Sequence, residues 1–124
     1  MNISLRSIVA ALTITNVTSA WLIVLASGFL EIVFSLAMKL SETFTKPIPS
    51  GISIVAGIFS VWLMSLTLKV IPVGTAYAVW AGIGAAGTAV VGMMFFEEPV
   101  TLARIGCIGL VIAGIVGLQL QTSA

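Results

Sequence analysis

The chain has 124 residues, of which 60% are hydrophobic and only 7% are charged, whereas a soluble domain carries about 25% charged residues. So few charges cannot cover a water-exposed surface, so we interpret the chain as an integral membrane protein. The absence of His, the single Cys and a net charge of +1 argue against His-based catalysis, metal sites, an intrachain disulfide and nucleic-acid binding. We therefore expect no enzyme activity, bound metal or cofactor.

Residues 1–20 are predicted to be an N-terminal extension. Their apolar stretch is short and is interrupted by Asn16 and Thr18, so it is too weak for a membrane span. Arg6 followed by an apolar run faintly resembles a signal peptide. We prefer a poorly ordered extension or a mis-assigned start to a cleaved signal.

Four apolar runs follow, each close to the roughly 20 residues that a transmembrane helix needs. The predicted helices comprise residues 21–39, 49–69, 73–96 and 102–120. All four prolines fall at their boundaries, where a missing N–H costs little. The period-2 alternation of a β-barrel is absent. The sequence therefore predicts an all-α integral membrane domain over residues 21–120, followed by a short tail at 121–124.

The basic residues are divided almost evenly between the two ends of this predicted bundle. Arg6 and Lys69 fall on one side, and Lys39, Lys46 and Arg104 fall on the other. Because an excess of Lys and Arg fixes the orientation of a membrane protein, two against three favours insertion either way round. The alternative is that five charges are too few for the count to carry a signal.

Glu31 lies well inside the first predicted span, whereas the other three acidic residues lie in connections. A carboxylate at that depth costs at least a few kcal/mol and usually faces a cavity or water. Desolvation disfavours the charged form of a carboxylate, and a bound cation restores it. We therefore predict that proton and cation compete for Glu31. The alternative is a structural, protonated glutamate bonded to a neighbouring helix.

Residues at helical spacing surround Glu31 with small and hydrogen-bonding side chains. Gly28 and Ser35 share its helix face. The second and third spans carry similar stripes, made of Ser53, Gly57, Ser60, Met64 and Thr67, and of Tyr77, Trp80, Ala81, Gly84 and Thr88. The ring faces of Tyr77 and Trp80 can attract a cation. Packing between helices explains the stripes of small residues equally well. The alternative explanation of the two aromatic rings is that they belong to a belt at the membrane–water interface.

One chain is too short to make a secondary transporter, since these commonly contain two inverted repeats and four helices supply one. An upside-down copy of the same chain can supply the other. Gly109, Ala113 and Gly117 allow close helix contact in the fourth span, so we assign them to dimerisation. Gly82 and Gly84 lower the cost of bending the third span, although close packing explains them as well.

Three strings closely resemble the small multidrug resistance family: GFLE around Glu31, PVGTAYAVWAGIGAAG at 72–87 and AGIVGL at 113–118. The resemblance covers residues 20–120. It implies an antiparallel, dual-topology dimer of four-helix subunits in the bacterial inner membrane, which exchanges cytoplasmic cations for protons through one glutamate per subunit. Carried over by position, the site consists of Glu31, the aromatic pair Tyr77 and Trp80, the hydroxyl of Ser60, and the kinking glycines Gly82 and Gly84.

The strings resemble the guanidinium-exporter branch most, but two positions depart from it. Phe34 stands where that branch usually has a tryptophan, and Ala81 stands where it commonly has a hydroxyl residue. The loss of the indole N–H removes a donor that could orient the carboxylate, so bulkier cations could be admitted. We place Gly28, Phe34 and Ser60 in the substrate pocket with the two aromatic residues.

The chemistry of the candidate substrates differs. Planar guanidinium pairs with a carboxylate through two parallel N–H···O bonds, which Ser60 beside Glu31 favours. Quaternary ammonium has no N–H and relies on ring faces, which Phe34 allows. We predict a proton-coupled exporter of guanidinium or guanidinyl cations acting as a homodimer. The alternatives are a broad quaternary ammonium exporter, half of a heterodimeric pair, or a membrane packing subunit without ion coupling.

Overall fold

The computed structural model describes residues 16–122, which form four long helices. These are α2 (Val17–Leu40), α3 (Pro47–Thr67), α4 (Val73–Phe95) and α5 (Leu102–Thr122). All four are long and apolar enough to cross a membrane, which confirms the prediction of four spans. The expectations for residues 1–15 and 123–124 lie outside the described residues.

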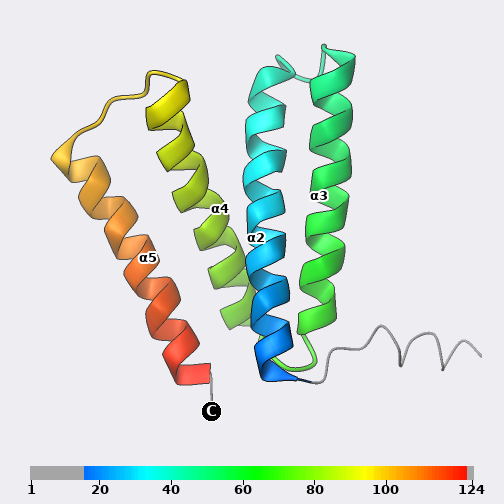
Figure 1. Ribbon diagram of the computed structural model, residues 1–124, viewed down its shortest axis with the longest axis vertical. Coiled ribbons are helices and arrows are strands. Elements are labelled where there is room, and N and C mark those ends of the chain that lie inside the picture. Colours follow the sequence, from blue (N-terminus) through cyan, green and yellow to red (C-terminus); the bar gives the residue numbers. More distant parts are fainter. Residues whose placement is uncertain (1–15, 123–124) are drawn as a thin grey trace, which may run out of the picture.

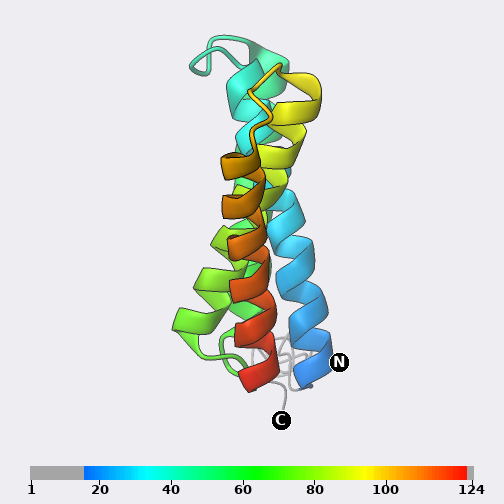
Figure 2. The ribbon, with the colours of Figure 1, turned by 90° about the vertical axis from the view of Figure 1, so that its left-hand side faces the viewer.

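The helices run alternately up and down, and α2 is the central one (Figure 1). It packs against α3 on one side and against α4 on the other, while α5 packs against α4. The view at 90° shows an elongated bundle whose α2–α3 and α4–α5 connections lie at the same end (Figure 2). A side chain in the middle of α2 can therefore be enclosed by both α3 and α4.

The first helix begins at Val17, four residues earlier than the sequence analysis predicts. Asn16 caps it, because its side-chain oxygen accepts the backbone N–H groups of Thr18 at 2.8 Å and Ser19 at 3.3 Å. Asn16, one of the two polar residues that argued against a membrane span, thus caps the start of one. Residues 17–20 belong to the helical bundle and not to an extension.

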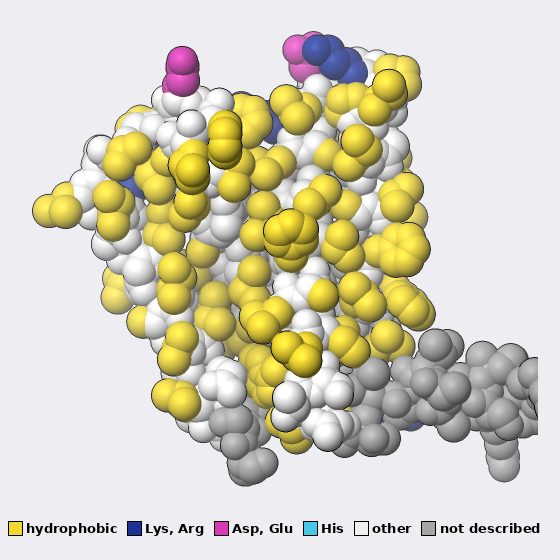
Figure 3. All heavy atoms as spheres, viewed as in Figure 1, with side chains coloured by type: hydrophobic (Ala, Val, Ile, Leu, Met, Phe, Trp, Pro, Cys, Tyr) yellow, Lys and Arg dark blue, Asp and Glu magenta, His cyan; other side chains and the backbone are white. Residues whose placement is uncertain are grey.

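A small buried core lies at the end of the bundle where α2 begins. It joins Ala20, Trp21 and Val24 of α2 to Ile71 of the α3–α4 turn and to Ala76 and Val79 of α4. Elsewhere much of the apolar surface points outward, and yellow side chains cover most of the face in Figure 3. Such a surface suits contact with acyl chains or with another subunit.

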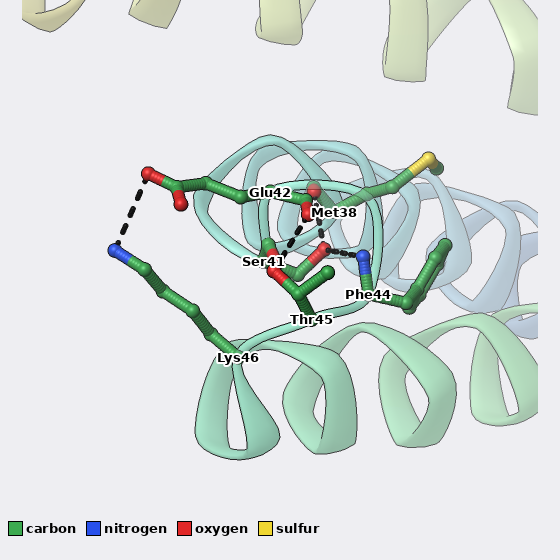
Figure 4. A network of polar contacts seen from close by, with 6 residues as sticks. All are labelled: Met38, Ser41, Glu42, Phe44, Thr45 and Lys46. Carbon is green, nitrogen blue, oxygen red and sulfur yellow. Dashed lines mark hydrogen bonds and ion pairs between the residues drawn. The ribbon is translucent and has the colours of Figure 1, made fainter.

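The connection between α2 and α3 is held by local polar contacts (Figure 4). The hydroxyl of Ser41 donates to the carbonyl of Met38 at 2.6 Å and accepts the backbone N–H of Phe44 at 2.9 Å. Glu42 and Lys46 form an exposed ion pair at 3.4 Å. These contacts fix a turn whose backbone is otherwise unfavourable for L-residues.

Thr43 occupies the left-handed region, with a φ of 64°, between Glu42 at 49° and Phe44 at 60°. A β-branched residue is strained there, and glycine is not. We expect Thr43→Gly to stabilise the protein by about 1 kcal/mol, seen as a rise of a few degrees in the thermal unfolding midpoint in detergent. Thr45→Gly is the control, since it removes hydroxyl contacts without relieving strain and lowers the midpoint. An equal fall for both variants would show that the turn is not strained.

Candidate functional site

Glu31 is half-buried on the central helix and lies between two cavities. One cavity of about 730 Å³ lies toward α3. The other, of about 520 Å³, runs along α4 and is called the α4 groove here. Glu31 and Trp80 line both, so a ligand in either cavity contacts the same carboxylate and the same indole ring.

The cavity toward α3 is mostly apolar. Besides Glu31 and Trp80, it is lined by Phe34, Ile54, Gly57, Ile58, Val61, Trp62 and Ser65. The Phe34 ring reaches this wall because Gly57 has no side chain, since a Cβ there would lie only 2.8 Å from Cδ1 of the ring. The cavity therefore offers ring faces and branched aliphatic groups beside one carboxylate.

The α4 groove is more polar. Besides Glu31 and Trp80, its lining consists of Ser35, Tyr77, Ala81, Gly84, Ala85, Thr88, Ala89, Glu98 and Arg104. The hydroxyls of Ser35 and Thr88 lie 2.6 Å apart and join α2 to α4. The rings of Tyr77 and Trp80 are 5.5 Å apart between centroids and are tilted by 58°. The groove near Glu31 thus offers hydroxyl oxygens from α2 and α4 and ring faces from α4.

Close approach of α2 and α4 depends on glycines. A Cβ at Gly84 would lie 2.6 Å from Cγ of Glu31, and one at Gly28 would lie 2.7 Å from Cγ2 of Ile83. Gly84 lines the groove, whereas Gly28 lines neither of the two cavities and serves the helix contact. A Cβ at Gly82 would meet side chains of α5, at 3.0 Å from Cδ1 of Ile115 and 3.4 Å from Cγ1 of Val111. The predicted kink at Gly82 and Gly84 stays a prediction.

Ser60 positions Trp80. The Ser60 side chain is fully buried, and its hydroxyl donates to the carbonyl of Ser27 at 2.7 Å while it accepts the indole N–H of Trp80 at 2.7 Å. This chain of bonds links α2, α3 and α4. The structure therefore connects Ser60 to the site through the indole that stands beside Glu31.

Replacing Ser60 tests this role. Ser60→Ala leaves the indole N–H of Trp80 without its acceptor, so we expect a loss of about 1–3 kcal/mol in the free energy of unfolding. Ser65→Ala is the matched control on the same helix, because that hydroxyl bonds only a carbonyl of its own helix and its loss costs less than about 0.5 kcal/mol. Thermal unfolding in detergent measures both, and equal shifts would contradict the positioning role.

The residues assigned to dimerisation lie on α5, where Gly117 is half-buried and the other two are exposed. Gly109 and Ala113 are exposed on α5, and a Cβ at Gly109 or Gly117 would meet nothing within 4 Å. This face of α5 is therefore free to pack against another helix. The role in dimerisation stays a prediction.

Sequence reasoning missed Glu98 and Arg104, which it placed in a connection and at a helix start. Arg104 Nη2 lies 3.1 Å from Glu98 Oε2, and both residues line the α4 groove with Glu31. The available signal was a pair of opposite charges on either side of a proline. Within residues 16–122, no group of three or more His, Cys, Asp or Glu side chains could hold a metal ion.

Comparison with known proteins places this geometry in context. Residues 19–116 match the family described as Small Multidrug Resistance protein. A guanidinium exporter from Yersinia pseudotuberculosis is 46% identical over 103 residues, which are 83% of this chain and 99% of the relative. Guanidinium exporters from Citrobacter freundii and Salmonella typhimurium are each 44% identical, over 83% and 82% of this chain and 98% and 97% of the relatives.

Proposed function

The chain belongs to the small multidrug resistance family, and from this premise we propose that it exports guanidinium or small guanidinyl cations in exchange for protons. It is a multi-pass protein of the bacterial inner membrane. The observation that carries the proposal is the position of Glu31, the one carboxylate inside a span among the described residues, between two cavities. The names of the relatives support the substrate class.

The exchange follows from the chemistry of one carboxylate. Ionised Glu31 accepts two parallel N–H donors of a guanidinium cation, and protonated Glu31 has lost the charge that attracts it. The ring of Trp80, fixed by its bond to Ser60, lies beside the carboxylate for stacking on the planar cation. Proton and cation therefore occupy Glu31 in turn, and each is released when the other binds.

The proposal includes an antiparallel homodimer. The cavities beside Glu31 are open in the single chain, and the α5 face around Gly109 is uncovered, so a second copy could close the site. Lys39, Lys46 and Arg104 lie near one end of the bundle, and Lys69 lies near the other. Arg6 precedes α2 in the sequence, and α2 begins at the end where Lys69 lies, so the basic residues divide three to two between the ends. Such a nearly even division permits insertion in both orientations.

A second substrate class is favoured by the cavity toward α3. Phe34 and Trp62 offer ring faces there, and quaternary ammonium ions bind through ring faces without needing N–H donors. Ring faces alone bind such ions weakly where the walls are partly exposed, whereas guanidinium adds two charge-assisted hydrogen bonds. We therefore rank guanidinium first.

Proteoliposomes with a pH-sensitive dye inside separate the two substrates. An outward gradient of guanidinium is expected to drive more proton uptake than an equal gradient of tetramethylammonium, by on the order of tenfold. Vesicles without protein control for passive leakage. Proton uptake driven more by tetramethylammonium would contradict the guanidinium assignment, and uptake driven by neither would contradict proton-coupled exchange.

A further inference from the structure

The α4 groove ends at an ion pair that the proposed exchange at Glu31 does not use. Glu98 and Arg104 line the groove that reaches Glu31 and Trp80 deeper in the bundle. Their side chains are 40% and 39% exposed, so water and dissolved cations can reach them. One groove thus has a carboxylate at depth and a second carboxylate at its outer end.

The Glu98 carboxylate is held in place by the backbone of α4. Its carboxylate oxygen lies where a Cβ of residue 92 would stand, so Gly92 is required for this position, and its backbone N–H donates to the Gly92 carbonyl at 3.3 Å. The carboxylate stands at the C-terminal end of α4, where the helix dipole disfavours negative charge. A cation at this point is therefore favourable, whichever molecule supplies it.

Arg104 supplies a cation beside the Glu98 carboxylate, but it does not use its full hydrogen-bonding capacity there. It makes a single contact with Glu98, at 3.1 Å from Nη2 to Oε2, and its buried Nε has no hydrogen-bond partner. A guanidinium group at its best geometry makes two parallel bonds to a carboxylate. Partly exposed pairs are also weak. The pair is thus poised to exchange with a cation that can make both bonds.

The side chain of Arg104 ends in a guanidinium group, which is the substrate proposed above. We propose that Glu98 is a second cation subsite at the outer end of the α4 groove, occupied by Arg104 when substrate is absent and by guanidinium on its way to or from Glu31. This inference rests on the proposed function. It adds a place where the substrate binds before or after the proton-coupled site.

Acceptors between the two carboxylates make the route chemically continuous. The hydroxyl of Ser35 donates to the carbonyl of Ile32 at 3.0 Å, so Thr88 is the donor in the Ser35–Thr88 pair. Each of these oxygens keeps a lone pair for an N–H of the cation. A guanidinium that leaves Glu98 can therefore bond hydroxyl oxygens before it reaches Glu31.

Opposite effects of two substitutions test the subsite. Glu98→Gln removes the carboxylate and is expected to raise the KM for guanidinium about two- to fivefold in proteoliposomes. Arg104→Met removes the competing guanidinium and is expected to lower the KM by a similar factor. If the pair only fastens the α4–α5 connection, both variants weaken transport in the same direction and lower the thermal unfolding midpoint together.

Two control substitutions account for surface charge. Glu97→Gln changes the charge as Glu98→Gln does, and Lys46→Met changes it as Arg104→Met does, and neither residue lines the groove. We expect both controls to leave the KM within a factor of about 1.5. The subsite is overturned if the controls shift the KM for guanidinium as much as Glu98→Gln and Arg104→Met do. It is also overturned if Glu98→Gln and Arg104→Met shift the KM in the same direction.

Failure of the subsite and failure of the proposed function look different. A wild-type protein that carries no guanidinium overturns both. Suppose instead that the wild type carries guanidinium, that Glu31→Gln abolishes this transport, and that Glu98→Gln leaves the KM unchanged. That combination overturns the subsite and leaves the proposed function intact. Arg104→Lys adds a check, because Lys keeps the charge without the planar fork and is expected to give an intermediate KM.

Discussion

Glu31→Gln is expected to abolish guanidinium-driven proton movement, by on the order of a hundredfold or more, while the protein stays folded. Glutamine has nearly the same shape as glutamic acid but neither releases a proton nor pairs with a cation as an ion. Because Glu31 lines both cavities, no other carboxylate inside the four helices can replace it. Proteoliposomes loaded with a pH-sensitive dye give the rate.

The matched control is Glu42→Gln, which removes a carboxylate from the exposed α2–α3 connection. We expect this variant to transport at the wild-type rate. Size-exclusion profiles and thermal unfolding in detergent check that both variants fold. If Glu31→Gln still couples guanidinium to protons, the exchange mechanism is wrong.

The second large effect is expected at Gly84. A methyl group there would lie 2.6 Å from Cγ and 3.2 Å from Cβ of Glu31. These atoms belong to the stem of the side chain, so α2 and α4 must separate or Glu31 must change rotamer. Overpacking of this kind costs about 1–3 kcal/mol. We expect Gly84→Ala to lower guanidinium transport by on the order of tenfold or more, because it moves the carboxylate away from Trp80.

Two glycines of the same helix serve as controls. The methyl group of Gly82→Ala meets the side chains of Ile115 and Val111 at 3.0–3.4 Å, and that of Gly74→Ala meets nothing within 4 Å. We expect a small effect at the first and no loss of transport at the second, since alanine favours a helix more than glycine does. If all three variants lose transport equally, bending of α4 and not the fit around Glu31 explains the glycines.

The four helices could be predicted from the sequence, because length and apolar composition decide whether a segment spans a membrane. The start of the first helix could not. Asn16 and its polar neighbours read as an interruption, yet the Asn16 side chain caps the helix. Apolar periodicity alone does not reveal that a polar residue satisfies free N–H groups at a helix end.

Part of the candidate site could be predicted from the sequence, although the roles of its residues stay predictions. Glu31 stood out because a carboxylate inside an apolar span needs a reason. Gly28 was assigned to the pocket because it lies on the same helix face as Glu31. In the structure it packs against Ile83 of α4. Residue spacing within one helix cannot reveal such a contact with another helix. Glu98 and Arg104 were missed because only the fold brings the Glu98 carboxylate of the α4–α5 connection back against Gly92, in the groove that reaches Glu31.

The most direct test of alternating occupancy is the proton released when guanidinium binds to the purified protein. In weakly buffered detergent solution with a pH indicator, wild type is expected to release protons on guanidinium addition, and Glu31→Gln is expected to release none. Because fewer protons compete at higher pH, the Kd for guanidinium is expected to fall as pH rises. Guanidinium binding that releases no proton and has the same Kd at every pH would contradict the account.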